Sequence, residues 1–292
     1  MTYFITAAAD YIRPWLFAET PVPGYVHSVY RGVVNLVFDY HFAALQPEAS
    51  PMSPITLAAG FPLEDLNVAA NTPVQIGEGK VRFEGGPVIE AAPETATVPT
   101  LMRRTLLSFS AMAARIKAVF DACTDPGMGF YPLFAEPCES RDLITSAMKT
   151  TLEDAETAFR RGKWEPFAET LTGLAGLGQG LTPSGDDFLC GMFAGFNSAG
   201  GLKGSHPAKA ALIAASDAMC RRTHPLSAAF ITCAAEGYVS QTVRALLGNP
   251  EQGFDVNAMA EKIQAIGHSS GIDTLCGIMF AYYLLTPALK KI

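Results

Sequence analysis

Charged side chains are scarce in this sequence. They make up 17% of its 292 residues, whereas an ordinary globular chain carries roughly a quarter. A buried interface with another subunit would explain the shortage, and so would a large compact core. The net charge of −7 argues against nucleic acid and against a membrane as partners. We therefore expect a stable homo-oligomer or hetero-oligomer that binds neither of them.

The sequence also lacks the usual signs of secretion, membrane insertion and disulfide bonding. Its first residues contain no basic segment, and Asp10 interrupts their apolar stretch, which is not typical of a signal peptide. The longest apolar helical run, Thr274 to Thr286, is too short to cross a bilayer. The six cysteines show no C-x-x-C spacing and stand mostly among apolar neighbours. These patterns predict a cytoplasmic protein with reduced thiols.

The first hundred residues are rich in strand-forming segments. "VHSVYRGVVNLVFD" has the valine and aromatic content of paired strands. "VQIGEGKVRFEGG" places apolar residues on both sides of a Gly-Glu-Gly-Lys turn, which indicates a hairpin. Residues 1–98 are therefore predicted to form a β-rich module, either a small barrel or a sandwich.

The pattern changes from strands to helices after "APETATVP" (residues 92–99). Apolar residues then recur at helical spacing, and helix-start and helix-stop signals alternate along the rest of the chain. Residues 99–292 are therefore predicted to form a larger all-helical module. The fold class is α+β, because no strands alternate with these helices as they would in a doubly wound sheet.

One short segment of the helical part occurs twice. "SGDDFLCGMFAGF" begins at Ser184, and "SGIDTLCGIMFAY" begins at Ser270. Ser-x-x-Asp before an apolar run is a capping box, so each serine is expected to start a helix, with Asp187 and Asp273 as the capping acids. Small residues four apart in each copy permit close helix packing. Duplication of a packing element would by itself account for the similarity.

Asp186 occurs only in the first copy and is not needed for capping. The preceding loop, "GLAGLGQGLTP", is dense in glycine, which allows a ligand to approach the backbone closely. Asp186 stands where a phosphate-binding loop would need lysine, and no strand precedes the loop as a dinucleotide site would require. Two carboxylates at a helix start would repel a bare phosphate. They favour either Mg²⁺, held by Asp186 and Asp187, or a ligand with N–H donors.

Further polar residues stand at three helix starts that would form one pocket if they converged. Each of them also has a structural explanation, as a local cap or as a satisfied core histidine. The candidate catalytic residues are Asp186, Asp187 and His268. The candidate ligand-binding residues are Gly178, Gly180, Thr182, Ser184, Thr223, Ser227, Ser269, Ser270 and Asp273.

Three motifs together resemble a known bacterial family. They are "GLGQGLTPSGDD" continuing to Gly191, "AAEGY" after Ser227, and "GHSSGIDTLCG" ending at Gly277. The family is one of mostly unassigned function that includes the small, AllH-type subunit of oxamate carbamoyltransferase. The resemblance implies a part in converting oxalurate and phosphate into oxamate and carbamoyl phosphate during purine and allantoin breakdown. It also implies a small anionic or amide substrate and other, larger subunits. The alternative is a non-catalytic binding or scaffold subunit with no site of its own.

Overall fold

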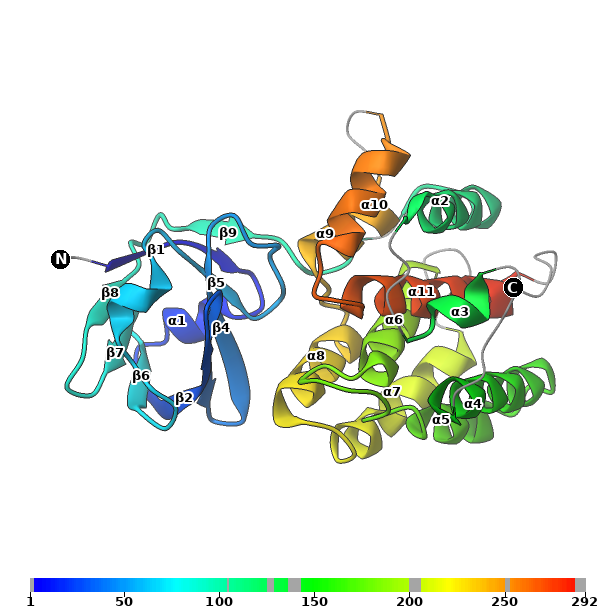
Figure 1. Cartoon of the computed structure of the whole chain (residues 1–292), viewed down its shortest axis with the longest axis horizontal. Helices are drawn as coiled ribbons and strands as arrows, with labels where there is room; N and C mark the ends of the chain where they lie inside the picture. The colour runs from blue at the N-terminus through cyan, green and yellow to red at the C-terminus, as the bar shows by residue number, and fades with distance from the viewer. Residues whose placement is uncertain are drawn as a thin grey trace. The chain divides into compact units, whose positions relative to one another are not determined.

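The computed structural model describes residues 3–103, 105–124, 129–135, 143–199, 206–249 and 253–286. The chain divides into two compact units, Met1–Leu101 and Met102–Ile292, and each is described by itself. The first unit is built from strands and the second from helices (Figure 1).

The first unit is a closed β-barrel. Eight strands follow one another around it in the order β5-β4-β3-β2-β6-β7-β8-β1, and antiparallel pairing of β1 with β5 closes the ring. The ninth strand, β9, extends the same edge of β1 that pairs with β8. The strands are β1 (Tyr3–Ala9), β2 (Val22–Tyr30), β3 (Val33–Phe38), β4 (His41–Pro47), β5 (Thr56–Ala59), β6 (Pro73–Gly77), β7 (Lys80–Phe83), β8 (Val88–Glu90) and β9 (Ala96–Val98).

In strands such as β6 and β7, alternation of buried and more exposed residues places one face inside the barrel. The predicted hairpin is formed by β6 and β7, with Glu78 and Gly79 in the left-handed conformation at its turn. Two short helical turns, α1 (Arg13–Leu16) and η1 (Leu63–Leu66), add apolar side chains to this core. The buried strand residues include Ile5, Val26, Leu36, Ala43, Leu45, Leu57, Val74, Ile76, Val81, Phe83 and Ile89.

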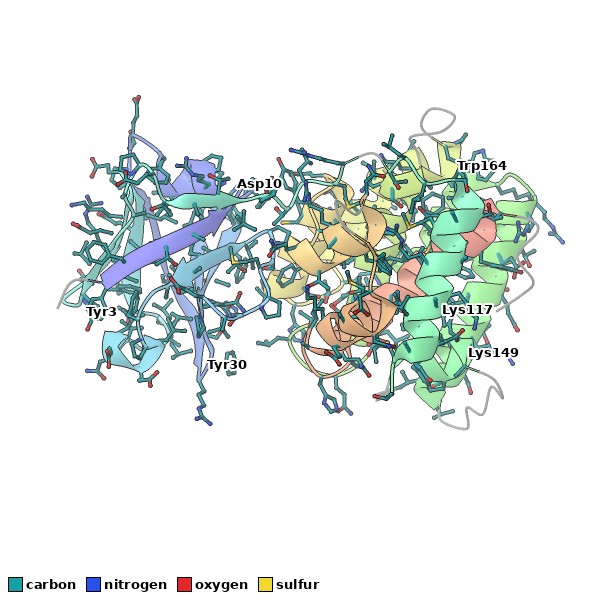
Figure 2. The ribbon with its side chains drawn as sticks, turned by 90° about the horizontal axis from the view of Figure 1, so that it is seen from above. Tyr3, Asp10, Tyr30, Lys117, Lys149 and Trp164 are labelled. Atoms are coloured by element: carbon teal, nitrogen blue, oxygen red, sulfur yellow. The ribbon has the colours of Figure 1, made fainter. Side chains whose placement is uncertain are left out.

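The end of the barrel chain is tied back to its beginning at Asp10, just after β1. Its backbone N–H donates to the Val98 carbonyl over 2.9 Å, and its Oδ1 accepts from the Thr100 N–H over 2.8 Å. Figure 2 labels Asp10 beside this segment. The prediction of a β-rich module followed by helices is confirmed, and the closed barrel is the form that the module takes.

In the second unit, the other helices are arranged around two central ones, α6 and α11. α11 is apolar on nearly all sides, since every residue from 271 to 284 except Thr274 is buried. No helix among the described residues has the length and apolarity needed to span a bilayer. The helices are α2 (Phe109–Ala122), α3 (Tyr131–Phe134), α4 (Leu143–Arg160), α5 (Trp164–Thr172), α6 (Ser184–Ala199), α7 (Pro207–Cys220), α8 (Pro225–Ala235), α9 (Gln241–Leu247), α10 (Val256–Gln264) and α11 (Ser270–Leu285).

The repeated segment forms α6 and α11, which cross in direct backbone contact. A Cβ atom on Gly191 would lie 2.0 Å from the Thr274 carbonyl oxygen, and one on Gly277 would lie 2.0 Å from the Phe188 carbonyl oxygen. Gly191 and Gly277 are equivalent positions of the two copies, and so are Phe188 and Thr274. The two contacts are therefore related by an approximate two-fold axis between the helices. Further along both, Gly195 faces the Ala281 methyl group. The helices therefore run in the same general direction, and the expected packing of their small faces is confirmed.

Replacement of Gly191 by alanine tests this crossing. Because the added methyl group would overlap the Thr274 carbonyl, we expect Gly191→Ala to lower the free energy of unfolding by at least about 2 kcal/mol. Gly253→Ala is the matched control, because no atom lies within 4 Å of a Cβ there. Urea unfolding of both variants measures the difference, and equal stabilities would contradict the close crossing.

Candidate functional site

Asp186 lies in the core of the helical unit, with both carboxylate oxygens occupied. Its side chain is 1% exposed. Oδ1 accepts from the Gly176 N–H over 2.8 Å, and Oδ2 accepts from the Ser227 hydroxyl over 2.7 Å and from the Thr223 hydroxyl. One carboxylate therefore joins the glycine-rich loop, the start of α6 and the start of α8. Three donors of the chain thus occupy most of the acceptor capacity of Asp186, which the sequence suggests as a ligand-facing carboxylate.

The glycine-rich loop is shaped by close packing rather than by an open cradle. Gly176 and Gly178 have positive φ angles of 78° and 128°. A Cβ on Gly176 would lie 2.4 Å from the Arg222 carbonyl oxygen, and one on Gly178 would lie 2.7 Å from the Ser184 nitrogen. Gly180 is exposed and meets nothing within 4 Å. Of the glycines chosen as ligand-binding candidates, Gly180 thus has free space beside it and Gly178 does not.

Asp187 and Asp273 reach across the helix crossing instead of capping their own helices. Asp187, on α6, interacts with the Ser270 hydroxyl at the start of α11 and with Thr182. Asp273, on α11, interacts with the Ser184 hydroxyl at the start of α6. The predicted capping boxes are therefore replaced by a reciprocal exchange. The helix starts lie so close together that each acid meets the serine of the other helix.

Each of these two carboxyl groups keeps one oxygen without a hydrogen-bond partner. The Oδ2 atoms of Asp187 and Asp273 are both inaccessible to solvent and unpartnered among the described residues. Buried polar atoms are normally hydrogen-bonded, since leaving one unsatisfied costs about 1–3 kcal/mol. Two such atoms at one crossing point indicate a site whose polar groups are completed by a proton or by a ligand.

Burial makes both carboxyl groups weaker acids than usual. It raises the pKa of Asp273 to about 6, against which the N–H of Phe130 and the hydroxyls of Ser184 and Ser269 act. Burial also raises the pKa of Asp187 well above its usual range, and the charges of Asp273 and Asp186 raise it further. Two like charges in such surroundings favour one protonated and one ionised carboxyl group. Burial therefore opposes ionisation of both carboxyl groups at the helix crossing.

The two halves of the site are not equally closed. The Phe130 N–H donates to Asp273 Oδ1 over 2.7 Å, and a Cβ on Gly129 would lie 2.3 Å from the same oxygen. Phe130 is held there by stacking on Phe188, with ring centroids 4.1 Å apart. No backbone N–H in the described part of the chain donates to Asp187 in the same way. Asp273 is fully buried, whereas Asp187 as a whole residue keeps some exposure.

Four of the remaining candidate residues lie near one of the acids, two beside Asp187 and two beside Asp186, whereas His268 lies apart from them. Thr182 and Ser270, whose hydroxyl oxygens are 3.2 Å apart, line the Asp187 side of the pair. Thr223 and Ser227 belong to the Asp186 cluster. His268 is exposed, and no hydrogen bond joins it to any of the three acids. The expected convergence of helix starts thus occurs for α6, α8 and α11, but it does not bring the His268 ring onto the carboxyl groups.

Metal binding and thiol reactivity both depend on how the described side chains are grouped and buried. Within those ranges no three His, Cys, Asp or Glu side chains are grouped so that they could hold a metal ion. The two oxygens of Asp186, an expected Mg²⁺ ligand, together accept three hydrogen bonds. Burial raises the pKa of the Cys190 and Cys276 thiols well above the usual value, which disfavours thiolate chemistry. Cys138 lies outside the described residues.

Gly129 and Phe130 complete the site but were not among the candidates from the sequence. They precede Asp273 by more than 140 residues and belong to no recognisable motif. The one distinctive local feature is the positive φ angle of Gly129, 95°. This backbone conformation cannot be read from the sequence. A conformation that favours glycine and a contact that excludes a Cβ both become visible only in the fold.

Loss of the Asp186 carboxylate should damage the fold. We expect Asp186→Ala to lower the free energy of unfolding by at least about 3 kcal/mol, because the Gly176 N–H and two hydroxyls lose their acceptor in a buried position. Asp154→Ala is the control, since Asp154 is exposed on α4. Urea unfolding of the two variants measures this, and equal stability would show that the cluster contributes nothing.

The raised pKa of Asp273 should make stability depend on pH. The folded protein holds this proton up to about pH 6, whereas the unfolded chain releases it near about pH 4. The wild type therefore loses stability relative to Asp273→Asn as the pH rises through this window, by about 2–3 kcal/mol in total. Chemical denaturation of both proteins between pH 4 and 8 measures the difference. A difference that stays constant with pH would contradict the raised pKa.

Comparison with known families agrees with the motifs in both units. The family model described as oxamate carbamoyltransferase subunit AllH matches residues 174–282, which include α6, α8 and nearly all of α11. The model described as the AllH family N-terminal domain matches residues 5–97, the barrel. No curated protein and no solved structure gave a match. The two family models together cover more than half of the chain, which therefore belongs to the AllH family, named for a subunit of oxamate carbamoyltransferase.

Proposed function

We propose that this chain is a working subunit of a carbamoyltransferase and that the crossing of α6 and α11 is its contribution to the chemistry. The proposed reaction converts oxalurate and phosphate into oxamate and carbamoyl phosphate, within allantoin and purine breakdown. The family description supports the role of a subunit. The observation that carries the proposal further is the Asp187–Asp273 pair, with one unpartnered buried oxygen on each carboxyl group.

The proposed reaction needs one proton to be removed and another to be supplied. An oxygen of hydrogen phosphate attacks the ureido carbon, and the bond between that carbon and the amide nitrogen breaks. The bonding electrons stay on the nitrogen, which gains a proton and becomes the amide of oxamate, while the phosphate loses its proton. A pair of carboxyl groups that holds one proton suits both needs, because the ionised member accepts a proton while the protonated member donates one.

Groups around the pair also suit a ureido or amide ligand. A carboxylate accepts hydrogen bonds from N–H groups, and the hydroxyls of Thr182 and Ser270 can donate to a carbonyl oxygen. Both hydroxyls lie on the Asp187 side, where the pair is less closed. No Lys or Arg side chain in the described ranges forms an ion pair with Asp187 or Asp273. We therefore infer that the cationic groups for phosphate come from another subunit, so that the full site forms only in the assembled enzyme.

A scaffold subunit is the second candidate function, and burial of the pair favours it. Asp273 is fully buried, and neither unpartnered oxygen is accessible to solvent. A proton shared between two buried carboxyl groups would then serve only to join the two helices. The two candidates differ in what an isosteric amide would do. It removes the acid–base function, but it keeps the shape and most of the hydrogen bonds.

The test uses the enzyme assembled with its other subunits and follows carbamoyl phosphate formed from oxalurate and phosphate. We expect Asp187→Asn and Asp273→Asn each to lower kcat by about a hundredfold or more, the usual contribution of general acid–base catalysis. Asp154→Asn on α4 is the control. Gel filtration shows whether each variant assembles. A fully active, assembled Asp187→Asn enzyme would support the scaffold function instead.

A further inference from the structure

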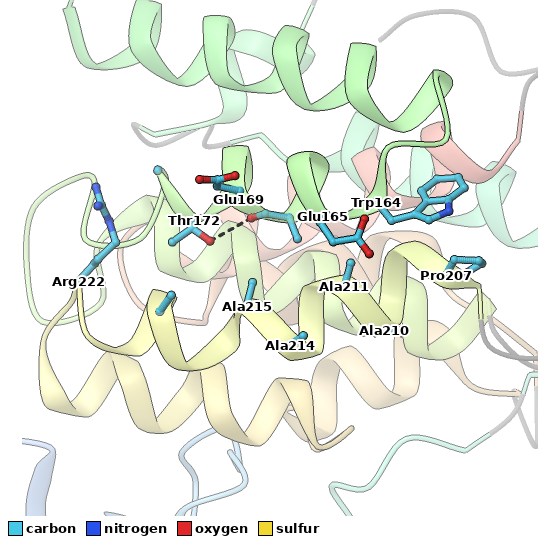
Figure 3. A pocket seen from close by; sticks show the side chains of 13 residues that line it. Trp164, Glu165, Glu169, Thr172, Pro207, Ala210, Ala211, Ala214, Ala215 and Arg222 are labelled. Carbon is cyan, nitrogen blue, oxygen red and sulfur yellow. Dashed lines mark hydrogen bonds between the residues drawn. The ribbon is translucent and has the colours of Figure 1, made fainter.

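An open groove runs between α5 and α7, away from the helix crossing (Figure 3). Its volume is about 880 Å³. The α7 side consists almost entirely of small residues: Ala210, Ala211, Ala214, Ala215 and Ala218. Two of these, Ala210 and Ala214, are exposed, and on the same helix Ile213 is 41% exposed. A helix surface without large side chains permits close approach of another helix, but it does not by itself identify the partner.

The charges of the groove are separated along its length. Glu165 and Glu169 stand on the α5 wall, and Arg222 follows the end of α7. In Figure 3, Arg222 lies with Thr172 at one end, whereas Trp164 and Pro207 lie at the other, close to Glu165. None of the three charged groups forms an ion pair with another described residue. The groove thus has an acidic α5 wall and a basic residue at one end, and no other described residue forms an ion pair with these charges.

We infer that this groove is a self-association surface, occupied by the same groove of a second copy of the chain. A two-fold axis perpendicular to the groove would exchange its two ends. Arg222 of each copy would then meet Glu165 of the other, giving two ion pairs from one set of residues. In Figure 3, Glu169 lies beside Thr172, between Arg222 and Glu165. Such a surface is complementary to itself, which is the requirement for a two-fold interface.

The small residues complete this arrangement. In the two-fold pair the α7 helices would run antiparallel, so that exposed Ala210 and Ala214 would face the equivalent residues of the second copy. Close approach there would cover the exposed part of Ile213. The low charge content of the chain, 17%, agrees with an additional covered face. This inference is independent of the proposed carbamoyltransferase function, since no groove residue belongs to the Asp187–Asp273 pair.

Charge reversal tests the pairing directly on the full-length chain. We expect the wild type to be a dimer by light scattering at micromolar concentration. Arg222→Glu places like charges opposite each other at both ends, and Glu165→Arg does the same with the opposite sign. Each variant should therefore raise the dimer Kd at least about tenfold. An equimolar mixture of the two variants should restore the dimer as a heterodimer, because both of its end contacts then join opposite charges.

Two reversals outside the groove serve as matched controls. Lys149→Glu and Glu153→Arg change exposed residues of α4, and Figure 2 labels Lys149 on the outside of that helix. Both control variants should remain dimeric. Ala214→Arg tests the surface by bulk instead of charge. It alters an exposed position, so the fold should persist, as thermal melting would check, while the dimer is lost.

Several results would overturn the inference. A monomeric wild type at these concentrations would exclude self-association through any surface. Dimers that survive both Arg222→Glu and Ala214→Arg would place the interface elsewhere. A mixture of Arg222→Glu and Glu165→Arg that stays monomeric, while each variant remains folded, would exclude the two-fold pairing. A groove that is needed only to bind another subunit, with the chain alone monomeric, would also contradict it.

Discussion

The rest of the helical unit depends on one contact, the direct approach of two helix backbones at Gly191 and Gly277. At each of these positions the carbonyl oxygen of the other helix occupies the space of a Cβ atom. The contact fixes how closely α6 and α11 approach and where along their length they cross. Because the two glycines are equivalent in the repeat, the crossing has an approximate two-fold axis. A side chain at either position would separate the helices and displace everything that lies at their starts.

The placement of the carboxyl groups follows from this crossing. Both helices run the same way from adjacent starts, so two positive helix ends lie side by side and favour negative charge there. Asp187 and Asp273 occupy that region and exchange serine partners between the helices. Burial opposes ionisation and the helix ends support it. Burial has the larger effect, since the pKa values of both carboxyl groups are raised.

Much of the fold could be predicted from the sequence, because its signals are local. The hairpin around Gly79 and the helix starts at Ser184 and Ser270 each depend on a few neighbouring residues. The partners of the three aspartates could not be predicted. A capping box and a crossed pair have the same Ser-x-x-Asp pattern, and only the distance between two helices decides between them. The role of Asp186 depends on hydroxyls that lie 37 and 41 residues further along the chain. Those contacts leave no trace in the local sequence.

The two copies of the repeated segment differ in sequence at several positions. These differences explain why the surroundings of Asp187 and Asp273 are unlike although the helix crossing is nearly symmetric. The position equivalent to Asp186 in the second copy is Ile272, which is buried among apolar neighbours. The first copy therefore holds the glycine-rich loop through a carboxylate, while the second copy needs no such anchor. In turn, Phe130 stacks on Phe188 of the first copy and donates its N–H to Asp273 of the second copy. This hydrogen bond favours the ionised form of Asp273, whereas the nearby charge of Asp186 disfavours ionisation of Asp187. The two carboxyl groups thus stand in unlike surroundings, although burial raises the pKa of both.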